Sequence, residues 1–496
     1  MKRWKNGIKR LKNKKFFLNL GLIFPVLFCP FNNALSSESS TDALLKILIK
    51  KGVLTEEEAQ EIKKEAETEA KKQKEEITKT TIEKIQKDSS ILPSALRGLK
   101  VGTLTYIDYS NGYLPNRVED TKGFSYFSLT RGYINVIKEI TPWLSFRITP
   151  DIKAGNVATN DLRLKYAYGL FKFPNLSFLT DIISEFGLGH FPWLDFEETI
   201  NPYRMQGYMA REFVGTFNSA DRGFSIAGNL GGKLNERYVK NLTYHYPTWK
   251  NYIGKYGSWW LSYMNGVGYE DSETNMGKAI EGRLTLRPFP YSTEGVLPLA
   301  GLQFSYFFIS GTGGQKNNNS YFRSPKYPRY DVHLGMLSYQ HPWFVITLQY
   351  SQAYGNHKGN WVVTPYEDRS KRKVLKNELW SAFGDVVLPI FNEKLHLFAR
   401  YDWIDPNSNV DRFCADNTCS KWIPKTDDIG KHYMVGLAYY LHENNILMLN
   451  FEWMNYDKYY RLSTTDQFHK MGVYDPSGKD HLKNAFRIQT VLQINF

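Results

Sequence analysis

Residues 483–496, KNAFRIQTVLQINF, end the chain in a nearly strict alternation of apolar and polar side chains. The apolar parity carries Phe486, Ile488, Leu492, Ile494 and Phe496. A period of two predicts a β-strand whose two faces lie in different environments. Chain ends are usually poorly ordered unless a neighbouring element holds them. We therefore expect this last strand to pair with the first strand of the same domain, near residues 99–109.

The same two-residue period recurs from residue 99 to residue 496, for example at 144–151, 280–287 and 395–402. A soluble sandwich shows the same alternation, so no single strand decides the fold. The 33 Tyr, 31 Phe and 12 Trp favour a membrane barrel, because aromatic side chains gather where an apolar band meets water. We predict an all-β transmembrane barrel over 99–496 with about 16 antiparallel strands, and 18 strands as the alternative.

The N-terminus has the pattern of an export signal. Residues 1–15 are cationic and residues 16–31 are apolar, and small residues follow, which predicts a signal peptide at 1–36. Pro25 and Pro30 disfavour the alternative of a single membrane-spanning helix. Cleavage removes eight Lys and Arg residues and no acid, so the formal charge falls from +13 to +5. An exported chain with this charge is not expected to bind nucleic acid.

Residues 41–88 carry a helical pattern on a highly charged background. Gly52 ends a short first helix, and Thr55 with Glu58 forms a capping box that begins a longer one. A thin stripe of Ala and Ile at three-to-four spacing predicts a small periplasmic coiled coil, with a solvated single helix as the alternative. Residues 89–98 then form a linker. A structural protein that tethers the outer membrane to the cell wall through this segment is the alternative to a transport function.

The polar parity of the predicted strands would line the barrel with more cations than acids. The inward acids on the same strands are Asp151, Glu281 and Asp402. Guanidinium groups in a water-filled tube raise the local anion concentration and match phosphate oxygens, which predicts a preference for anions. The alternative is that these cations pair with lumen acids and only stiffen the wall. Arg131 stays open, because the parity slips near Gly132, and Tyr166 and Tyr168 are expected to face lipid. The expected pore-lining cations are Arg147, Arg163, Lys165, Arg283, Arg287, Arg400 and Arg487.

Two long connections carry many charges and aromatic residues. Residues 187–213 are the best candidate for a loop that folds into the pore, where opposed charges would form a constriction; an outward-facing loop is the alternative. Its candidate charges are Asp195, Glu197, Glu198, Arg204 and Arg211. Residues 235–257 form a second long loop, which is basic and rich in Tyr. We expect this second loop to be extracellular.

Enzymatic and metal chemistry are weakly represented. After cleavage, Cys414 and Cys419 remain in a polar loop and are expected to form a disulfide rather than a metal site. Ser110 stands in a Ser-Asn-Gly motif, but the position two residues before it, where outer-membrane phospholipases carry a histidine base, is Asp108. Without a base the serine is not activated. We therefore expect no enzyme activity, no cofactor and no metal.

Six stretches, in order, resemble the phosphate-selective porin O and P family. They are LLKILIKKGVLTEEEAQEI (44–62), FSLTRGYINV (127–136), DRGFSIAGNL (221–230), YMNGVGY (263–269), GRLTLRPFP (282–290) and ARYDWIDP (399–406). The resemblance implies a homotrimer of 16-stranded outer-membrane barrels, each with its own pore for passive diffusion of small hydrophilic solutes, and a periplasmic coiled coil. The final Phe496 also resembles the signal that the barrel-insertion machinery reads. The resemblance does not identify the solute.

Overall fold

The computed structural model divides the chain into two compact units, residues 1–97 and 98–496. It describes residues 47–53, 55–62, 64–65, 68, 96–114, 122–154, 160–247, 252–314, 327–359, 361, 374–405, 408–409, 412–414, 422–424, 430–456, 460–461, 473–474 and 484–496. The expected signal peptide (1–36), most of the expected coiled coil and Cys419 lie outside these residues, and they remain predictions. Among the described residues, no helix is long and apolar enough to cross a membrane.

The described part of the first unit is helical at residues 47–50 and 56–62. Gly52 has a positive φ of 68°, a conformation that glycine adopts without steric cost, and it follows the first helix as expected. The capping box is also confirmed. The Glu58 amide donates to Thr55 Oγ1 at 3.2 Å, and the Thr55 amide donates to Glu58 Oε2 at 2.9 Å.

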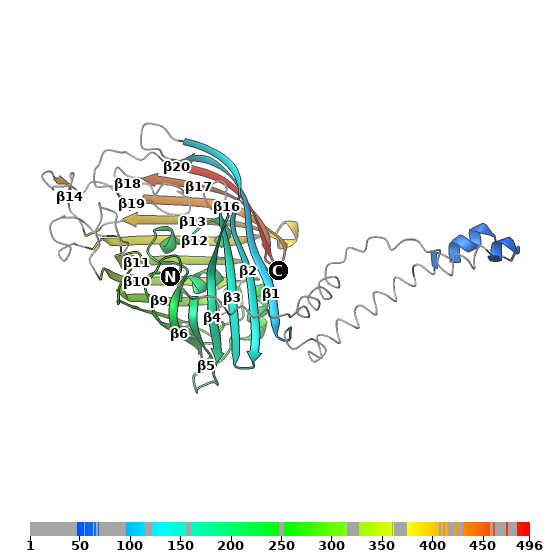
Figure 1. Cartoon of the computed structure of the whole chain (residues 1–496), viewed down its shortest axis with the longest axis horizontal. Helices are drawn as coiled ribbons and strands as arrows, with labels where there is room; N and C mark the ends of the chain where they lie inside the picture. The colour runs from blue at the N-terminus through cyan, green and yellow to red at the C-terminus, as the bar shows by residue number, and fades with distance from the viewer. Residues whose placement is uncertain are drawn as a thin grey trace, which may run out of the picture. The chain divides into compact units, whose positions relative to one another are not determined.

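The second unit is a closed barrel of 16 strands (Figure 1). Every strand pairs with its neighbours in antiparallel register, which confirms the predicted fold and excludes the alternative of 18 barrel strands within the described residues. Two short ribbons, β14–β15 (Arg412–Cys414 and Trp422–Pro424) and β18–β19 (Tyr460–Arg461 and Val473–Tyr474), pair separately. The barrel strands are β1 (Leu99–Leu114), β2 (Lys122–Thr141), β3 (Leu144–Ala154), β4 (Asn160–Lys172), β5 (Leu179–His190), β6 (Ala220–Leu230), β7 (Gly257–Met264), β8 (Ala279–Leu286), β9 (Leu302–Thr312), β10 (Arg329–His341), β11 (Phe344–Tyr354), β12 (Lys376–Leu388), β13 (Leu395–Asp405), β16 (Gly430–His442), β17 (Asn445–Tyr456) and β20 (Ala485–Asn495).

The last strand closes the barrel against the first, as predicted. β20 pairs with β1 from Leu104↔Asn495 to Tyr113↔Phe486. The register extends to the final residue, where the Thr103 amide donates to the Phe496 carbonyl at 2.9 Å. Because both edges are paired, the barrel leaves no open row of backbone donors and acceptors in its sheet.

The outer face of the barrel is apolar, with aromatic residues towards both ends. Leu162 and Phe186 are 71% and 66% exposed, although such side chains are normally buried in a water-soluble domain. Trp143 and Trp343 lie in tight turns at one end, while Trp380 lies on the outer face towards the other. An apolar band between aromatic belts is the surface that a barrel presents to lipid.

The two ends of the barrel differ in their connections. One end, here the turn end, carries two-residue turns such as 142–143, 342–343 and 443–444, together with the start of β1 and the end of β20. The opposite end, here the loop end, carries the connections that contain β14–β15 and β18–β19. The turn end lies on the right of Figure 1.

Two connections fold into the barrel from opposite ends. The inner loop, residues 191–219 between β5 and β6, enters from the loop end and contains α4 (Leu194–Ile200), η2 (Arg204–Gln206) and α5 (Ala210–Phe213). The inner helix segment, residues 231–247 and 252–256 between β6 and β7, enters from the turn end and contains α6 (Glu236–His245). We expected this second connection to be extracellular; it lies instead at the end with the short turns, which bacterial outer-membrane barrels usually turn towards the periplasm.

The inner helix segment is drawn inwards by three side chains that recur every four residues. Tyr238, Leu242 and Tyr246 are buried on one face of α6 and its C-terminal cap. The Tyr238 hydroxyl donates to the Gln340 carbonyl at 3.0 Å, so the helix is fixed to β10. This spacing gives α6 an apolar face, and that face packs against the barrel interior rather than against lipid.

A hydrophobic core fills the barrel interior beside strands β9 to β13, β16 and β17. Inward residues such as Phe307, Val332 and Phe398 pack against Phe191, Trp193 and other apolar residues of the inner loop. Burying each large apolar side chain contributes about 1.5–3 kcal/mol. This half of the interior is therefore closely packed, and it holds both inner connections in place.

The candidate channel and its charged lining

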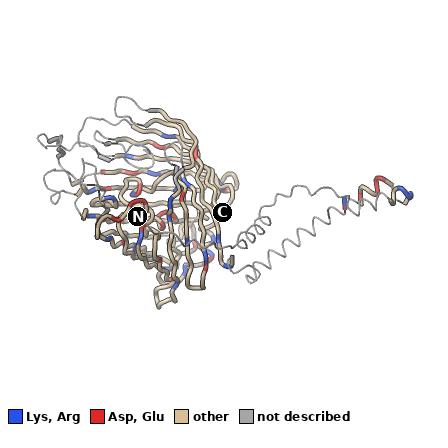
Figure 2. The backbone as a smooth tube through the Cα atoms, in the orientation of Figure 1, with Lys and Arg blue, Asp and Glu red and all other residues tan. Residues whose placement is uncertain are grey.

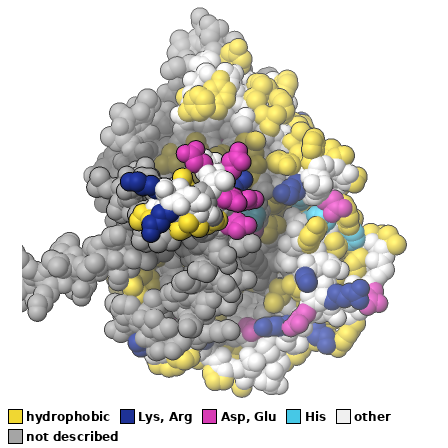
Figure 3. All heavy atoms as spheres, turned by 90° about the vertical axis from the view of Figure 1, so that its right-hand side faces the viewer, with side chains coloured by type: hydrophobic (Ala, Val, Ile, Leu, Met, Phe, Trp, Pro, Cys, Tyr) yellow, Lys and Arg dark blue, Asp and Glu magenta, His cyan; other side chains and the backbone are white. Residues whose placement is uncertain are grey.

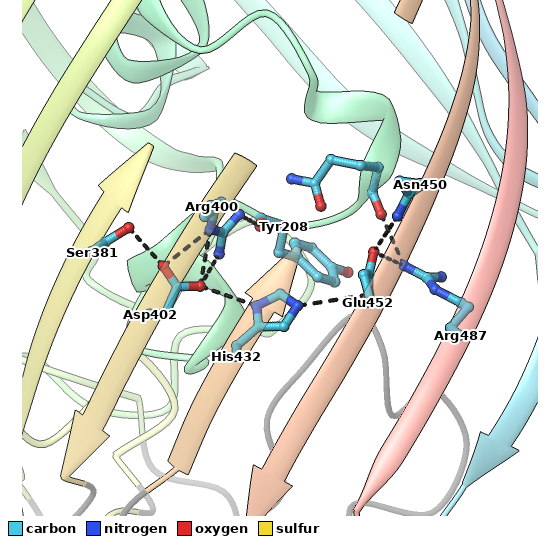
Figure 4. Close-up of polar contacts among 9 residues, drawn as sticks. Tyr208, Ser381, Arg400, Asp402, His432, Asn450, Glu452 and Arg487 are labelled. Carbon is cyan, nitrogen blue, oxygen red and sulfur yellow. Dashed lines mark hydrogen bonds and ion pairs between the residues drawn. The ribbon is translucent and has the colours of Figure 1, made fainter. Parts of the chain in front are cut away.

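A network of five ionisable side chains crosses four adjacent strands on the inner wall (Figure 4). Arg400 on β13 pairs with Asp402 at 2.7 Å, and His432 on β16 lies 3.1 Å from Asp402. His432 also lies 3.8 Å from Glu452 on β17, which pairs with Arg487 on β20 at 2.6 Å. The histidine thus lies between two carboxylates, each of which pairs with an arginine, so the network carries little net charge.

The network binds the inner loop through backbone carbonyls. Arg400 Nη1 donates to the Tyr208 carbonyl at 2.8 Å, and Arg487 Nη2 donates to the Gln206 carbonyl at 2.9 Å. The Phe213 ring stacks on His432 with ring centres 4.9 Å apart. Because their donors are used in these contacts, Arg400 and Arg487 hold the inner loop against the wall and do not face open water.

Arg283 and Arg287 on the β8 side of the barrel are also engaged. Arg283 lies over the rings of Phe196 and Tyr252 at 4.3 and 4.6 Å, and Arg287 donates to the Ala300 carbonyl. With Arg400 and Arg487, these arginines point inwards as expected but are only 1–4% exposed. Five of the seven expected lining cations are thus buried, because Lys165 on β4 is also only 2% exposed.

The charges of the inner loop pair with each other instead of opposing one another across a gap. Arg204 lies 2.9 Å from Glu198 and 2.7 Å from Glu212. Arg211 is buried and donates to Ser351 Oγ at 2.9 Å and to the Asn377 side chain. These residues therefore do not form the transverse constriction that we expected from the sequence.

Two acids of the inner loop have different surroundings. Glu197 is buried and accepts from Trp193 Nε1 at 2.9 Å, and burial raises the pKa of the Glu197 carboxyl to about 8. Asp195, by contrast, retains 28% of its side-chain exposure and accepts from the Tyr252 hydroxyl of the inner helix segment. Asp195 is therefore the candidate charge that faces water where the two inner connections meet.

Strands β2 to β4 carry the cations that keep some exposure, and irregular pairing determines which of them point inwards. In β2, Tyr106↔Arg131 is followed by Ile107↔Leu129, so Thr130 is an extra residue and Arg131 turns inwards. In β4, Thr149↔Tyr166 is followed by Pro150↔Leu164, so Lys165 is the extra residue. Lys165 and Tyr166 therefore both point inwards.

The expectation that Tyr166 and Tyr168 face lipid is wrong for this reason. The Tyr166 and Tyr168 rings lie 4.4 and 5.3 Å from the His190 ring inside the barrel. Arg147 lies 4.6 Å from the Tyr166 ring centre. A bulge inverts the alternation of every residue that follows it, and an alternating sequence does not mark the position of the bulge.

Cations and tyrosines alternate along this polar side of the interior. Lys165 donates to the Ser219 hydroxyl and lies 5.0 Å from the Tyr269 ring centre. Arg163 pairs with Asp151 at 2.7 Å and with Glu270, and it retains 21% of its side-chain exposure. Basic and acidic residues are likewise interspersed along the strands in Figure 2. The polar lining is thus mixed in charge.

A cavity of about 410 Å³ lies between strands β3 to β7 and the inner connections. At its inner end, Arg147 Nη1 lies 3.1 Å from His190 Nε2, and His190 Nδ1 lies 2.7 Å from Glu185 Oε1. Towards the turn end it is lined by Asp181, Asn229 and Lys233. Figure 3, which faces the turn end, shows acidic and basic side chains beside each other on the rim.

The residues considered for metal and serine chemistry have the following surroundings in the described part of the chain. No group of three or more His, Cys, Asp and Glu side chains there is arranged to hold a metal ion. Ser110 donates to Asp108 Oδ2 at 2.8 Å, and Asp108 also accepts from Ser128 and Gln489, so this serine belongs to a wall hydrogen-bond cluster. Cys414 lies in β14, but Cys419 is outside the described residues, so the disulfide remains a prediction.

Neither a protein-family model nor a curated protein matches the chain. Among solved structures, the fold is similar to the anion-selective porin from Comamonas acidovorans (11% identity, 80% of this chain and 100% of that chain, TM-score 0.47). It is also similar to the outer membrane channel DcaP of Acinetobacter baumannii (10% identity, 82% and 99%, TM-score 0.46) and to Salmonella typhi OmpF (11% identity, 80% and 97%, TM-score 0.46). The assignment of the barrel itself rests on its strand pairing.

Proposed function

We propose that the protein is an outer-membrane porin that lets small hydrophilic solutes diffuse passively along one side of its barrel. The observation that supports this most directly is the polar cavity of about 410 Å³ beside strands β3 to β7, opposite the hydrophobic core. Beyond this cavity, towards the loop end, lie Tyr166 with Lys165 and the partly exposed pair of Arg163 and Glu270. Because outer-membrane barrels have short turns on the periplasmic side, the turn end faces the periplasm.

We propose a weak preference for anions, including phosphate. Of the cations expected to line the pore, Arg147 and Arg163 keep partial exposure, and their guanidinium groups suit oxyanions. Glu270, Asp195, Asp181 and Glu185 lie in the same lining and oppose this preference, so the selectivity is modest. Excess guanidinium charge in a narrow lumen would favour anions more strongly if these acids were absent.

Single-channel recording of the purified full-length protein in a salt gradient tests both statements. We expect discrete, energy-independent conductance and a reversal potential slightly on the anion side. Arg163→Gln should move the reversal potential towards cations, whereas Arg329→Gln, a change at an exposed pair on the loop-end edge of β10, should not. Absence of conductance would refute the pore, and clear cation preference would refute the selectivity.

The remaining expectations concern assembly. We propose a homotrimer in outer-membrane lipid, organised in part by a periplasmic coiled coil within residues 41–88, and insertion guided by Phe496. The side chain of Phe496 is 80% exposed on the barrel exterior, so it is accessible to a partner. Mass measurement in detergent before and after removal of residues 41–88, and insertion assays with Phe496→Ala, test these points separately.

A further inference from the structure

The cavity beside strands β3 to β7 has a lining that does not suit a simple anion. Its charged side chains are two cations, Arg147 and Lys233, and three carboxylates, Asp181, Glu185 and Asp195. A phosphate or dicarboxylate entering this space would meet more negative than positive groups. The lining therefore favours a ligand without net charge.

Donors and acceptors are present together at each end of the cavity. At the inner end, Arg147 bonds to Asn135, Thr149, His190 and Tyr168, which leaves one of its five N–H donors, and Asp195 Oδ1 lies 3.9 Å from the nearest histidine nitrogen. A carboxylate oxygen and a guanidinium donor thus face the same end. A hydroxyl group can use both, because it donates and accepts.

The end towards the turns repeats this combination. Lys233 makes no ion pair among the described residues, and its ammonium supplies donors only. Asp181 accepts from Asn229 Nδ2 at 3.0 Å through Oδ2 and keeps its second oxygen. A solute with hydroxyl groups around its perimeter can satisfy both ends.

The walls between these ends are aromatic. Tyr168, Tyr252 and Trp260 line the cavity together with Leu170 and Ile183. Apolar and aromatic walls with a few placed polar groups are the usual construction of small-molecule sites, in cavities of about 300–1,000 Å³. The C–H faces of a pyranose ring pack against such rings while its hydroxyl groups point to the rim.

We propose that this cavity is a binding subsite for a neutral, polyhydroxylated solute of one or two sugar rings. The proposal rests on the proposed channel function and names a solute class that this channel retains during passage. Trp260 and Tyr252 supply the apolar walls, and Arg147, Asp195, Asp181 and Lys233 supply hydrogen bonds to hydroxyl groups. Binding at such a subsite raises the local solute concentration and slows each passage, so current through an occupied channel falls.

Current block by added sugar tests the subsite in the full-length protein. Maltose and glucose added on the turn side of a planar bilayer should reduce the ion current reversibly and saturably, with half-block at millimolar concentration. Asp195→Asn and Lys233→Met should each raise the half-blocking concentration about tenfold, the change produced by losing one good hydrogen-bond partner. Trp380→Ala, a matched aromatic change on the lipid-facing surface of β12, should leave it unchanged.

The outcomes separate the two proposals. No conductance in the absence of sugar would refute the channel itself. Normal conductance that neither maltose nor glucose reduces, or a block by inorganic phosphate that exceeds the sugar block, would refute the subsite alone. Because Trp260→Ala removes a buried ring and can misfold the barrel, Lys233→Met and Asp181→Asn at the mouth provide the test that does not depend on packing.

Discussion

Arg147 Nη1 and His190 Nε2 lie 3.1 Å apart at the inner end of the cavity. Arginine cannot accept a hydrogen bond and stays protonated, so Nε2 must be the acceptor. The Nδ1 atom, 2.7 Å from Glu185 Oε1, then carries the proton. This hydrogen-bond pattern fits a neutral His190 with its proton on Nδ1, beside a permanent cation and two carboxylates.

Acidification should therefore shift the ion selectivity towards anions. Protonated His190 adds one positive charge to the narrow lining and can no longer accept from Arg147, while Glu185, Asp195, Tyr166, Tyr168 and Trp260 are the other groups that face its ring. We expect the anion-to-cation permeability ratio to rise as the pH falls through the range in which histidine titrates. Reversal potentials between pH 8 and pH 5 measure this shift.

His190→Phe should remove the pH response of the selectivity, because the phenylalanine ring fits the same space but cannot be protonated. His333→Gln provides the control, since His333 lies on the outer face and contacts Tyr306 rather than the lumen. A pH response that persists unchanged in His190→Phe would contradict the assignment.

The network around His432 should determine how firmly the inner loop is held. Glu452→Gln leaves the buried Arg487 without its carboxylate and removes one of the two carboxylates beside His432, and breaking a buried pair in this way costs about 3–5 kcal/mol. We expect a lower melting temperature, measured by the heat-dependent gel shift of the folded barrel, and larger current fluctuations as the inner loop loosens. Lys100→Gln breaks an exposed pair with Glu139 and should change little.

Much of this architecture follows from the sequence, and the exceptions have physical causes. The alternation at 483–496 defines which residues of β20 face inwards, and Arg487, Gln489 and Gln493 are buried there as expected. The alternation does not reveal that apolar side chains fill part of the barrel interior. Phe307, Val332 and Phe398 point inwards, but the sequence of each single strand does not distinguish them from residues that face lipid.

The acids that neutralise the wall were also missed, although a signal for them exists. Glu452 and Asp385 lie on the inward parity of β17 and β12, and so does His432 on β16. Counting every inward ionisable residue, instead of those on five clear strands, predicts a mixed lining. The contacts that bury Arg400 and Arg487 could not be predicted, because they use backbone carbonyls of a loop 192 and 281 residues away in sequence.

Glu197 should make the folded protein less stable at alkaline pH. Its folded-state pKa of about 8 lies above the ordinary carboxyl value, so the proton is bound more tightly in the folded protein. Stability from this group is complete below the ordinary value, declines as the pH rises towards about 8 and then levels off. We expect Glu197→Gln to melt at a higher temperature than the native protein at pH 9, and to differ little at pH 4.

Asp385 links the inner loop to the inner helix segment, and it should therefore control the width of the channel. It accepts from the Tyr203 hydroxyl of the inner loop at 2.7 Å and from the Tyr246 hydroxyl of the inner helix segment at 2.5 Å, and His396 Nδ1 lies 3.0 Å away. Asp385→Leu removes the shared acceptor and leaves two buried hydroxyl groups without a partner, each at a cost of about 1–3 kcal/mol. The two connections then separate, and single-channel conductance should increase severalfold. Tyr203→Phe and Tyr246→Phe each release one connection, so each should give a smaller increase than Asp385→Leu. Equal conductance in Asp385→Leu and the native protein would show that the inner connections are held by the hydrophobic core alone.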